Sequence, residues 1–222
     1  KSSFGNTLCG RQAFSTSSGS SSHTRRSCSA DRIFDGTNII IFDTPGLFDT
    51  HADFSVIKQK ICDAVTKIAS PGPHAFLIVV SAGRFTDEEQ KTVQLINDMF
   101  GKDAGKYCIL IITREDDILY EGSTIKEYIE RSTKPFKDLV AQCENRYLAM
   151  NNRAGKEERD DKVRTLITIV RQMLDNNQTP FYTNEMFIKA EEELRQREEA
   201  VLAQVNTEIE AKKQALRDEV TV

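Results

Sequence analysis

The sequence lacks a long hydrophobic run, an excess of charge of one sign and any closely spaced pair of cysteines. Its longest apolar stretches, at 75–80 and 108–112, fall well short of the ~18 residues that indicate a membrane-spanning helix. The 222 residues include 30 Lys or Arg and 34 Asp or Glu, so the net charge of -4 gives no global field for nucleic acid or an anionic membrane. We therefore expect no transmembrane segment and no nucleic-acid partner, and any recognition of phosphate must be local.

The five cysteines are an odd number, lie far apart and form no C-x-x-C pair. This spacing argues against a disulfide framework and a zinc cluster, and it favours a reducing compartment. The sequence opens with Lys1 rather than Met and shows no apolar signal-peptide region, so we expect it to begin inside a longer chain.

Short apolar runs alternate with amphipathic stretches over residues 1–150. Most of these runs are continuously apolar, as strands buried on both faces are, and they predict strands at 38–42, 75–80, 107–112 and 146–150. Between them, apolar side chains recur at helical spacing at 54–68 and 93–100. This order predicts an α/β fold in which helices cover a parallel sheet.

Two segments depart from this alternation. Residues 15–29 are rich in Ser and Thr, which predicts a surface loop. The composition changes after Gly155, and we expect a domain at 1–155 followed by a helical extension at 156–222.

A long charged helix is predicted within this extension, over 183–219. Its apolar residues form a narrow stripe of Leu202, Val205, Ile209 and Leu216. We expect this stripe to dock the helix on the domain. A coiled coil that pairs with a partner or with a second copy is the alternative.

The first candidate motif is Lys1-Ser2-Ser3-Phe4-Gly5-Asn6. In a phosphate-binding loop, G-x-x-x-x-G-K-[ST], backbone N–H groups surround the phosphates, the Lys ammonium reaches the β and γ oxygens, and the hydroxyl binds Mg²⁺. Lys1 and Ser2 match the last two residues of that pattern, and we include Ser3 as a further contact. Taken alone, the pair also fits a chain end without a function.

The second motif is Asp43-Thr44-Pro45-Gly46, directly after the strand at 38–42. A carboxylate at the C-terminal end of a parallel strand faces the crevice where such sheets bind ligands, so Asp43 is a candidate to hold Mg²⁺ through water. Gly46 lets a backbone N–H approach a γ-phosphate. An ordinary turn that ends the strand is the alternative.

The third motif, Thr113-Arg114-Glu115-Asp116, follows the strand at 107–112 and resembles the [NT]-K-x-D element of GTPases, with Arg114 in place of Lys. The Asp116 carboxylate would accept hydrogen bonds from two donors of guanine, which adenine does not offer in that arrangement. A solvated acidic turn is the alternative.

Two weaker signals complete the set. Asn151 and Asn152 follow the last strand, where their amides would contact the base or form a plain turn. Thr24 lies in the polar loop before Asp43, where a switch threonine would close over Mg²⁺ and the γ-phosphate. The order of these signals along the chain, each at a strand end or helix start, is what indicates a nucleotide site.

With Gly83-Arg84-Phe85-Thr86 after the strand at 75–80 and the tract at 146–154, these motifs resemble the GIMAP family. These are the immunity-associated GTPases with an AIG-type G domain, related to septins and chloroplast import receptors, and the likeness covers residues 1–155. The resemblance implies a doubly wound, mostly parallel α/β sheet of the phosphate-loop GTPase type, its first strand and glycine-rich loop truncated, with a C-terminal helical extension.

The resemblance also implies ligands and partners. GTP or GDP would contact Lys1, Ser2, Ser3, Gly46, Thr113, Arg114, Asp116, Asn151 and Asn152, and Mg²⁺ would be held by Ser2, Thr24 and Asp43. It implies a homo- or hetero-dimer through the nucleotide face, with Arg84 as a candidate catalytic residue, and a cytoplasmic protein, with peripheral attachment to an endomembrane left open. Leu47 stands where many GTPases carry the Gln that orients water, so hydrolysis should be slow.

Two rival functions remain open from the sequence. One is a nucleotide-independent interaction or scaffold protein, built on a degenerate GTPase fold and acting through its C-terminal helix. The other is an ATPase of the same fold, which Asp116 disfavours.

Overall fold

The computed structural model describes residues 1–15, 28–43, 72–83, 85, 96, 98 and 101–220. Two pieces of β structure lie within these ranges. Strands β1 (Cys28–Phe34) and β2 (Thr37–Asp43) form an antiparallel hairpin. Strands β3 (Phe76–Ser81), β4 (Cys108–Thr113) and β5 (Tyr147–Met150) form a parallel sheet in the order β3-β4-β5.

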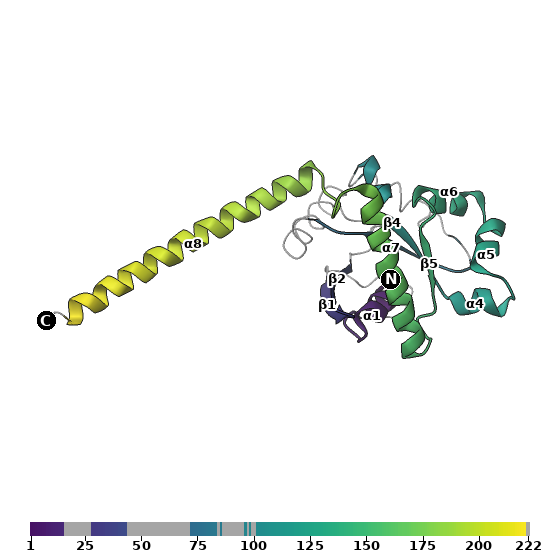
Figure 1. Cartoon of the computed structure of the whole chain (residues 1–222), viewed down its shortest axis with the longest axis horizontal. Coiled ribbons are helices and arrows are strands. Elements are labelled where there is room, and N and C mark those ends of the chain that lie inside the picture. Colours follow the sequence, from purple (N-terminus) through teal and green to yellow (C-terminus); the bar gives the residue numbers. More distant parts are fainter. Residues whose placement is uncertain are drawn as a thin grey trace.

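Helices lie on both sides of the parallel sheet, with α7 on one side and α4, α5 and α6 on the other (Figure 1). The helical elements are α1 (Ser2–Cys9), the 3₁₀ helix η1 (Lys102–Tyr107), α4 (Glu115–Tyr120), α5 (Ile125–Arg131), α6 (Lys134–Gln142), α7 (Lys156–Asn177) and α8 (Glu185–Val220). Ile96 and Asp98 are helical, as predicted for 93–100, and the predicted helix at 54–68 lies outside the described residues.

Strand β4 forms the centre of the core. Each residue from Cys108 to Ile112 is fully buried, because β3 and β5 pair with its two edges and helices cover its faces. The register aligns Ser81, Thr113 and Met150 at the carboxyl ends of the three strands. The four strands predicted from apolar runs are confirmed, with ends that differ by one residue. The strand at 38–42 was expected in the parallel sheet, but among the described residues β2 pairs with β1 instead, and the two run antiparallel.

Strand β1 was not predicted, and the loop expected at 15–29 is wrong at Cys28 and Ser29, which belong to this strand. Its sequence mixes three polar residues with four apolar ones, and it contains no apolar run of the kind that predicted the other strands. The structure forms it by pairing all seven residues with β2 across a tight turn at Asp35 and Gly36, whose φ angles are 46° and 73°. Two successive positive φ angles are typical of the turn that Asp-Gly favours in hairpins, and this dipeptide was the signal available in the sequence.

The hairpin is attached to α7 through ion pairs. Arg32 Nη2 lies 2.8 Å from Asp160 Oδ1, and the two side chains are only 16% and 12% exposed. The Arg32 guanidinium also lies 4.3 Å from the centre of the Phe34 ring. A second, more exposed pair joins Arg164 Nε to Asp35 Oδ2 at 2.8 Å. Because the described strands of the two sheets do not pair with each other, these contacts with α7 help to set the position of the hairpin.

An aromatic cluster anchors the start of α8 to the globular body. The Tyr182 ring packs edge-on against Phe76, Tyr107 and Phe187, with ring centres 5.1, 5.2 and 6.0 Å apart. Its backbone N–H donates to the carbonyl of Pro73 at 2.8 Å. Burial raises the pKa of Tyr182 to about 12, so the ring stays neutral at physiological pH.

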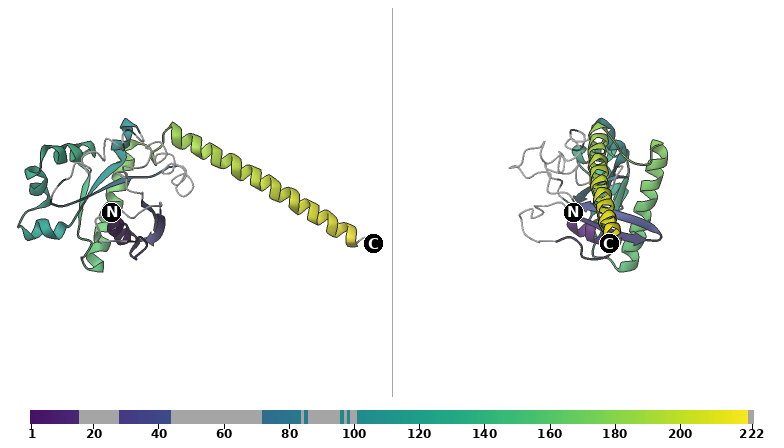
Figure 2. Two further views of the ribbon diagram at one scale, coloured as in Figure 1. Left: turned by 180° about the vertical axis from the view of Figure 1, so that it is seen from behind. Right: turned by 90° about the vertical axis from the view of Figure 1, so that its left-hand side faces the viewer.

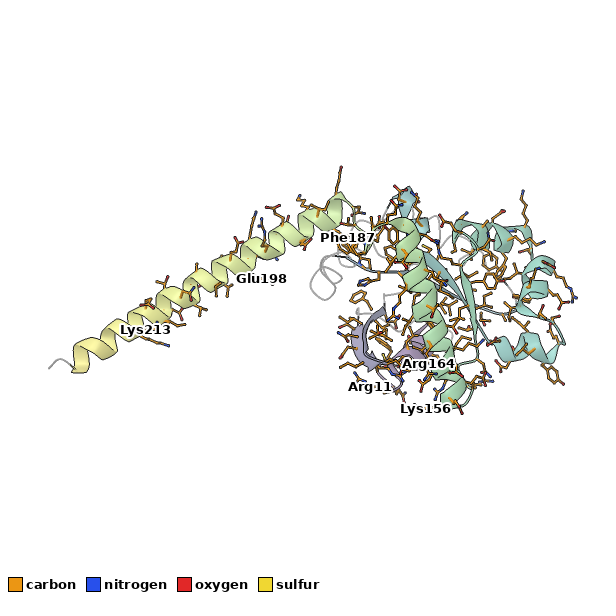
Figure 3. All side chains as sticks on the ribbon, in the orientation of Figure 1. Arg11, Lys156, Arg164, Phe187, Glu198 and Lys213 are labelled. Atoms are coloured by element: carbon orange, nitrogen blue, oxygen red, sulfur yellow. The ribbon has the colours of Figure 1, made fainter. Side chains whose placement is uncertain are left out.

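Beyond this anchor, α8 projects away from the body (Figures 1 and 2). Leu202, Val205 and Ile209 are 61%, 43% and 43% exposed, so the expectation that the stripe docks on the domain is wrong. The stripe shares its helix face with Glu198 and Lys212, and burying these charges against an apolar core would be costly. The side chains along the helix accordingly lie far from the body (Figure 3).

In the described part of the chain, α8 included, no helix combines the length and the apolar character needed to cross a bilayer. The predicted boundary between a domain at 1–155 and an extension at 156–222 stays a prediction. Helix α7, which follows that boundary, packs on β5, whereas α8 leaves the body.

The Arg32–Asp160 pair should contribute measurably to stability. Asp160→Ala leaves the Arg32 guanidinium largely buried without its carboxylate, so we expect the free energy of unfolding to fall by about 2–3 kcal/mol in urea denaturation. The matched control is Glu130→Ala, which removes the exposed partner of Lys126 and should cost less than about 0.5 kcal/mol. Equal small losses for both variants would show that the buried pair does not hold the hairpin.

The same variant tests a pH dependence. Hydrogen bonds from Lys156 and from Arg32 hold the pKa of Asp160 below its ordinary value, although desolvation opposes them. The ionised carboxylate therefore stabilises the fold above its unfolded-state pKa, and this contribution is lost as the pH falls through the lower folded-state pKa. The stability difference between the original protein and Asp160→Ala should be constant near neutral pH and should narrow below about pH 4.

Candidate functional site

The carboxyl ends of β3, β4 and β5 form one edge of the sheet, and the predicted site residues follow these ends. Thr113 ends β4, Arg114 and Asp116 come next, and Asn151 and Asn152 follow β5. In open α/β sheets, ligands bind in the crevice outside the carboxyl ends of the strands. The structure thus places the predicted base-contacting residues on neighbouring loops of the expected edge.

Ser2 and Asp43, the two predicted metal ligands that the structure describes, lie in direct contact. Ser2 Oγ donates a hydrogen bond to Asp43 Oδ2 at 2.8 Å, although 41 positions separate them in sequence. Ser2 is the first residue of α1, and Asp43 is the last residue of β2. A hydroxyl and a carboxylate oxygen are hard ligands of the kind that Mg²⁺ prefers, so this pair fits the predicted ion.

Helix α1 points its N-terminus at this pair. Lys1 caps the helix, Ser2 and Ser3 form its first turn, and that turn carries no acidic side chain. The unpaired N–H groups and the dipole at a helix N-terminus attract anions, phosphate among them. Lys1, Ser2, Ser3 and Asp43 therefore form one local group of charged and hydrogen-bonding atoms.

Close packing behind the helix fixes its direction. A Cβ atom on Gly5 would lie 2.8 Å from the Phe14 ring, so only glycine fits there without movement. Asn6 Oδ1 accepts hydrogen bonds from the backbone N–H groups of Ala13 and Phe14, at 2.8 and 2.7 Å. These contacts hold the segment after α1 against its inner face.

The predicted guanine motif begins at the end of β4. Thr113 Oγ1 donates to the Val80 carbonyl at 2.9 Å and so ties β4 to β3. Arg114 has a φ of 64°, which turns the chain into α4, and its guanidinium forms an ion pair with Asp117. Asp116 lies half-buried in the first turn of α4. The structure thus pairs Arg114 with a residue of α4. The expectation that its side chain lies along a guanine base stays a prediction.

Glu115 is a buried residue that the sequence did not single out. It is only 7% exposed, and its Oε1 lies 2.7 Å from Lys162 Nζ on α7. Its other oxygen, Oε2, is buried without a hydrogen-bond partner among the described residues. The pair links α7 to α4 immediately beside Asp116. A run of three acidic residues gave no sign of which one is buried.

The two asparagines after β5 have different surroundings. Asn151 Oδ1 accepts from the Arg153 N–H at 2.9 Å, which is the turn role considered as the alternative. Asn152 Oδ1 accepts from Thr7 Oγ1 on α1 at 2.9 Å. Asn152 therefore connects the loop after β5 to the helix that carries Ser2.

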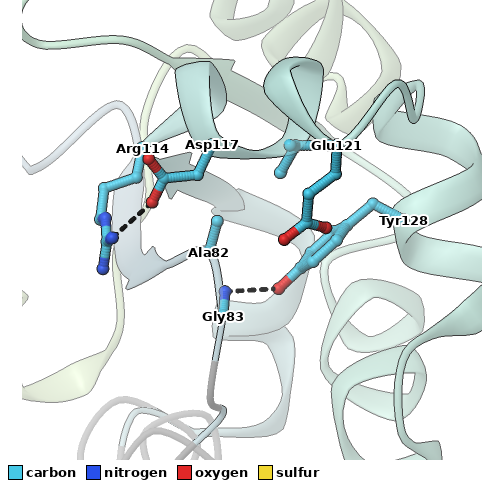
Figure 4. A pocket seen from close by; sticks show the side chains of 7 residues that line it. Ala82, Gly83, Arg114, Asp117, Glu121 and Tyr128 are labelled. Carbon is cyan, nitrogen blue, oxygen red and sulfur yellow. Dashed lines mark hydrogen bonds and ion pairs between the residues drawn. The ribbon is translucent and has the colours of Figure 1, made fainter.

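A pocket of about 240 Å³ adjoins this edge, between the end of β3 and helices α4 and α5 (Figure 4). The Tyr128 hydroxyl accepts from the Gly83 N–H at 3.1 Å on one side, and the Arg114–Asp117 ion pair lies on the other. Tyr128 therefore fixes the first residue of the 83–86 motif that the resemblance singled out. No motif in the sequence pointed to Tyr128.

Three predicted site residues, Thr24, Gly46 and Arg84, lie outside the described residues, as does Leu47. Their roles stay predictions. Among the described residues, no group of three or more His, Cys, Asp or Glu side chains is placed to hold a metal ion. The Ser2–Asp43 pair is a different kind of site, since it combines one carboxylate with a hydroxyl at a helix N-terminus.

Comparisons with known proteins identify sequence relatives and structures of similar fold. A family model described as the AIG1 family matches residues 1–201. The chain is 34% identical over 199 residues to immune-associated nucleotide-binding protein 9 of Arabidopsis thaliana, covering 87% of this chain and 57% of that protein. It is 29% identical to human GTPase IMAP family member 8, covering 83% of this chain and 27% of that protein. The chain thus spans only part of the curated relatives.

Solved structures show the same fold at lower identity. A dimerization-deficient mutant of Toc33 from Arabidopsis thaliana superposes with a TM-score of 0.52 at 21% identity, covering 81% of each chain. Toc33 solved in complex with GDP and Mg²⁺ gives a TM-score of 0.50 over the same shares. A bacterial dynamin GTPase, LeoA, gives 0.53 at 16% identity, covering 92% of this chain and 38% of that one. These likenesses establish a GTPase-type α/β fold.

The Glu115–Lys162 pair gives a test of how the edge is held together. Lys162→Met leaves a buried carboxylate without its cation, and we expect the free energy of unfolding to fall by about 3 kcal/mol. The double variant Lys162→Met/Glu115→Leu removes both charges and should recover most of this loss, as followed by urea denaturation. A double variant as unstable as Lys162→Met alone would mean that the lysine acts through packing rather than through the ion pair.

Proposed function

Because the chain belongs to the AIG1 family, we propose that it binds guanine nucleotide with Mg²⁺ and acts as a GTPase-type switch. One observation carries the proposal: Ser2 Oγ and Asp43 Oδ2 lie 2.8 Å apart at the N-terminus of α1. The curated relatives are longer than this chain, so what they bind or do as whole proteins supports the proposal only by analogy.

The phosphate end of the site consists of Lys1, Ser2, Ser3 and Asp43. The Lys1 ammonium and the first-turn N–H groups of α1 bind phosphate oxygens. When Mg²⁺ is bound, it neutralises charge that develops on the phosphates. Ser2 and Asp43, which lie in hydrogen-bond contact, would hold that ion, Ser2 through its hydroxyl and Asp43 through water. Thr24 and Gly46 complete this end as the switch threonine and the γ-phosphate sensor.

The base end of the site uses the loops after β4 and β5. Asp116 accepts hydrogen bonds from guanine, the stem of Arg114 lies along the base plane, and Thr113 fixes the start of the loop. Asn151 and Asn152 contact the base from the other loop. Asn152 also bonds to Thr7 on α1, so the two ends of the site are joined by a direct contact.

Solved structures of a neighbour support the choice of ligand and of a dimer. Toc33 has been solved with GDP and Mg²⁺ and with Mg²⁺ and GMPPNP, and one Toc33 variant is described as deficient in dimerization. We propose a dimer across the nucleotide face of this protein, with slow hydrolysis because Leu47 replaces a water-orienting Gln, and with Arg84 supplied across the contact. A cytoplasmic location accords with the free thiols of Cys9, Cys108 and Cys143.

A second candidate function is a nucleotide-independent scaffold that acts through α8. The exposure of Leu202, Val205 and Ile209 on a projecting helix favours a role in binding another protein chain. The two functions are compatible, because the helix and the nucleotide site occupy different parts of the molecule (Figure 1).

Base specificity is the direct test of the proposal. Calorimetry with GTP, GDP and ATP in Mg²⁺ should show binding of the guanine nucleotides alone. It should be run on this chain and on a version extended by any residues that the gene encodes before Lys1. Asp116→Asn should weaken GTP binding by about 2–4 kcal/mol and favour xanthine nucleotides, because the amide offers a donor where the carboxylate accepted.

Asp117→Asn is the matched control, since it changes a neighbouring carboxylate that pairs with Arg114. We expect it to alter GTP affinity by less than tenfold and to leave the base preference unchanged. Unaltered GTP binding by Asp116→Asn would remove Asp116 from the site, and no binding of any nucleotide by either version would favour the scaffold function.

Hydrolysis should depend on protein concentration. Without a water-orienting amide at Leu47, the monomer should turn over GTP very slowly, and the rate per molecule should rise as dimers form. Phosphate release measured over a range of concentrations tests this, with Arg84→Ala expected to flatten the rise. Rapid turnover that does not change with concentration would contradict both the slow monomer and the dimer.

A further inference from the structure

One face of helix α8 is left uncovered by the described part of the chain. Val201, Leu202, Val205 and Ile209 are each between 43% and 61% exposed on a helix whose only buried described side chain is Phe187, in its first turn. The left view of Figure 2 shows the helix extending from the body. Apolar side chains at these spacings lie on one helix face, which is the arrangement of a helix that packs against another helix.

Apart from Leu202, whose mirror position is Glu208, the pattern on this face is symmetric about Val205. Val201 and Ile209 lie four residues to either side, and Glu198 and Lys212 lie seven residues to either side. Steps of three and four residues keep all five positions on the same face of a helix. The two aliphatic positions therefore mirror each other, and the two charged positions mirror each other with opposite sign.

This symmetry points to a second copy of the chain as the occupant. We propose that α8 pairs with α8 of another copy in an antiparallel coiled coil whose two-fold axis passes Val205. In that arrangement Val205 meets its own counterpart, Val201 faces Ile209 of the other helix, and Glu198 faces Lys212. Two-fold symmetry repeats the Val201–Ile209 contact and the Glu198–Lys212 contact once on each side of Val205. The dimer would therefore bury the aliphatic face and form one pair of opposite charges at each end.

Charge favours the antiparallel arrangement over the parallel one. A parallel pair in register would place Glu198 against Glu198 and Lys212 against Lys212 within the seam, where like charges repel. Within the described residues, Glu198 and Lys212 form no ion pair in the single chain, so both are available. The neighbouring Lys213 is paired with Glu210 on its own helix, at 2.7 Å.

The antiparallel geometry also separates the two globular bodies. A helix rises about 1.5 Å per residue, so the two Phe187 anchors would lie about 54 Å apart along the pair. The nucleotide edge of each body stays uncovered by this contact, because the aromatic anchor of α8 lies at the opposite ends of β3 and β4. The α8 pair is therefore a contact distinct from the proposed dimer across the nucleotide face.

Charge reversal on the full chain, without nucleotide, tests both the partner and the direction. Sedimentation equilibrium should show a reversible dimer. Glu198→Lys and Lys212→Glu should each weaken this dimer by at least tenfold, because each creates two like-charged pairs. The double variant Glu198→Lys/Lys212→Glu should restore the original affinity, since the opposite charges then face each other again. Glu193→Lys makes the same charge change on another face of α8 and should leave the dimer unchanged.

Each other outcome overturns the proposal. A chain that stays monomeric up to several hundred micromolar has no self-pairing helix. A dimer that survives Val205→Asp forms elsewhere, and circular dichroism confirms that the helix persists in that variant. Failure of the double variant to recover the affinity lost by the single variants excludes the antiparallel register. Because no nucleotide is added, none of these results depends on whether the chain binds GTP.

Discussion

The ion pair between Arg32 and Asp160 joins two parts of the protein that share no strand pairing among the described residues. The hairpin β1–β2 belongs to one part, and the parallel sheet β3–β5 belongs to the other. Helix α7 packs on β5 and binds the hairpin through Asp160. Asp43 is the last residue of β2 in this hairpin, so the Arg32–Asp160 ion pair also helps to position the Asp43 carboxylate against Ser2. The geometry of the proposed phosphate-binding residues thus depends on a charged contact outside them.

The proposed guanine-contacting residues around Asp116 also depend on helix α7. Lys162 lies two residues after Asp160, and its bond to Glu115 sets α4 against α7 beside Asp116. Removing one partner of a buried ion pair leaves an uncompensated charge and is strongly destabilising, so each pair resists separation of the segments that it joins. The first turns of α7 therefore hold two opposite sides of the site through two neighbouring ion pairs.

The features that could be predicted from the sequence are those set by the local residue pattern and by the order of motifs along the chain. Strand β4 could be found because a strand buried on both faces must be apolar throughout. Ser2 and Asp43 could be proposed as partners because their motifs follow the order of a phosphate-loop nucleotide site, with Ser2 at a helix start and Asp43 at a strand end. Strand β1 was missed because its polar residues gain their place from pairing with β2. The burial of Glu115 and the direction of α8 were not predictable, since both depend on contacts between distant segments.

The position of the α8 anchor explains why the candidate site and the exposed face of α8 lie in separate parts of the molecule. Phe76 begins β3 and Tyr107 immediately precedes β4, so the aromatic cluster lies at the amino ends of the strands. Ser81 and Thr113 end the same strands at the opposite edge, where the candidate site lies. The length of the strands therefore separates the first turn of α8 from the edge of the sheet that carries the candidate site. A ligand at the edge changes α8 only if it moves α7 or the strands themselves, because no described side chain of α8 beyond its first turns is buried against the body.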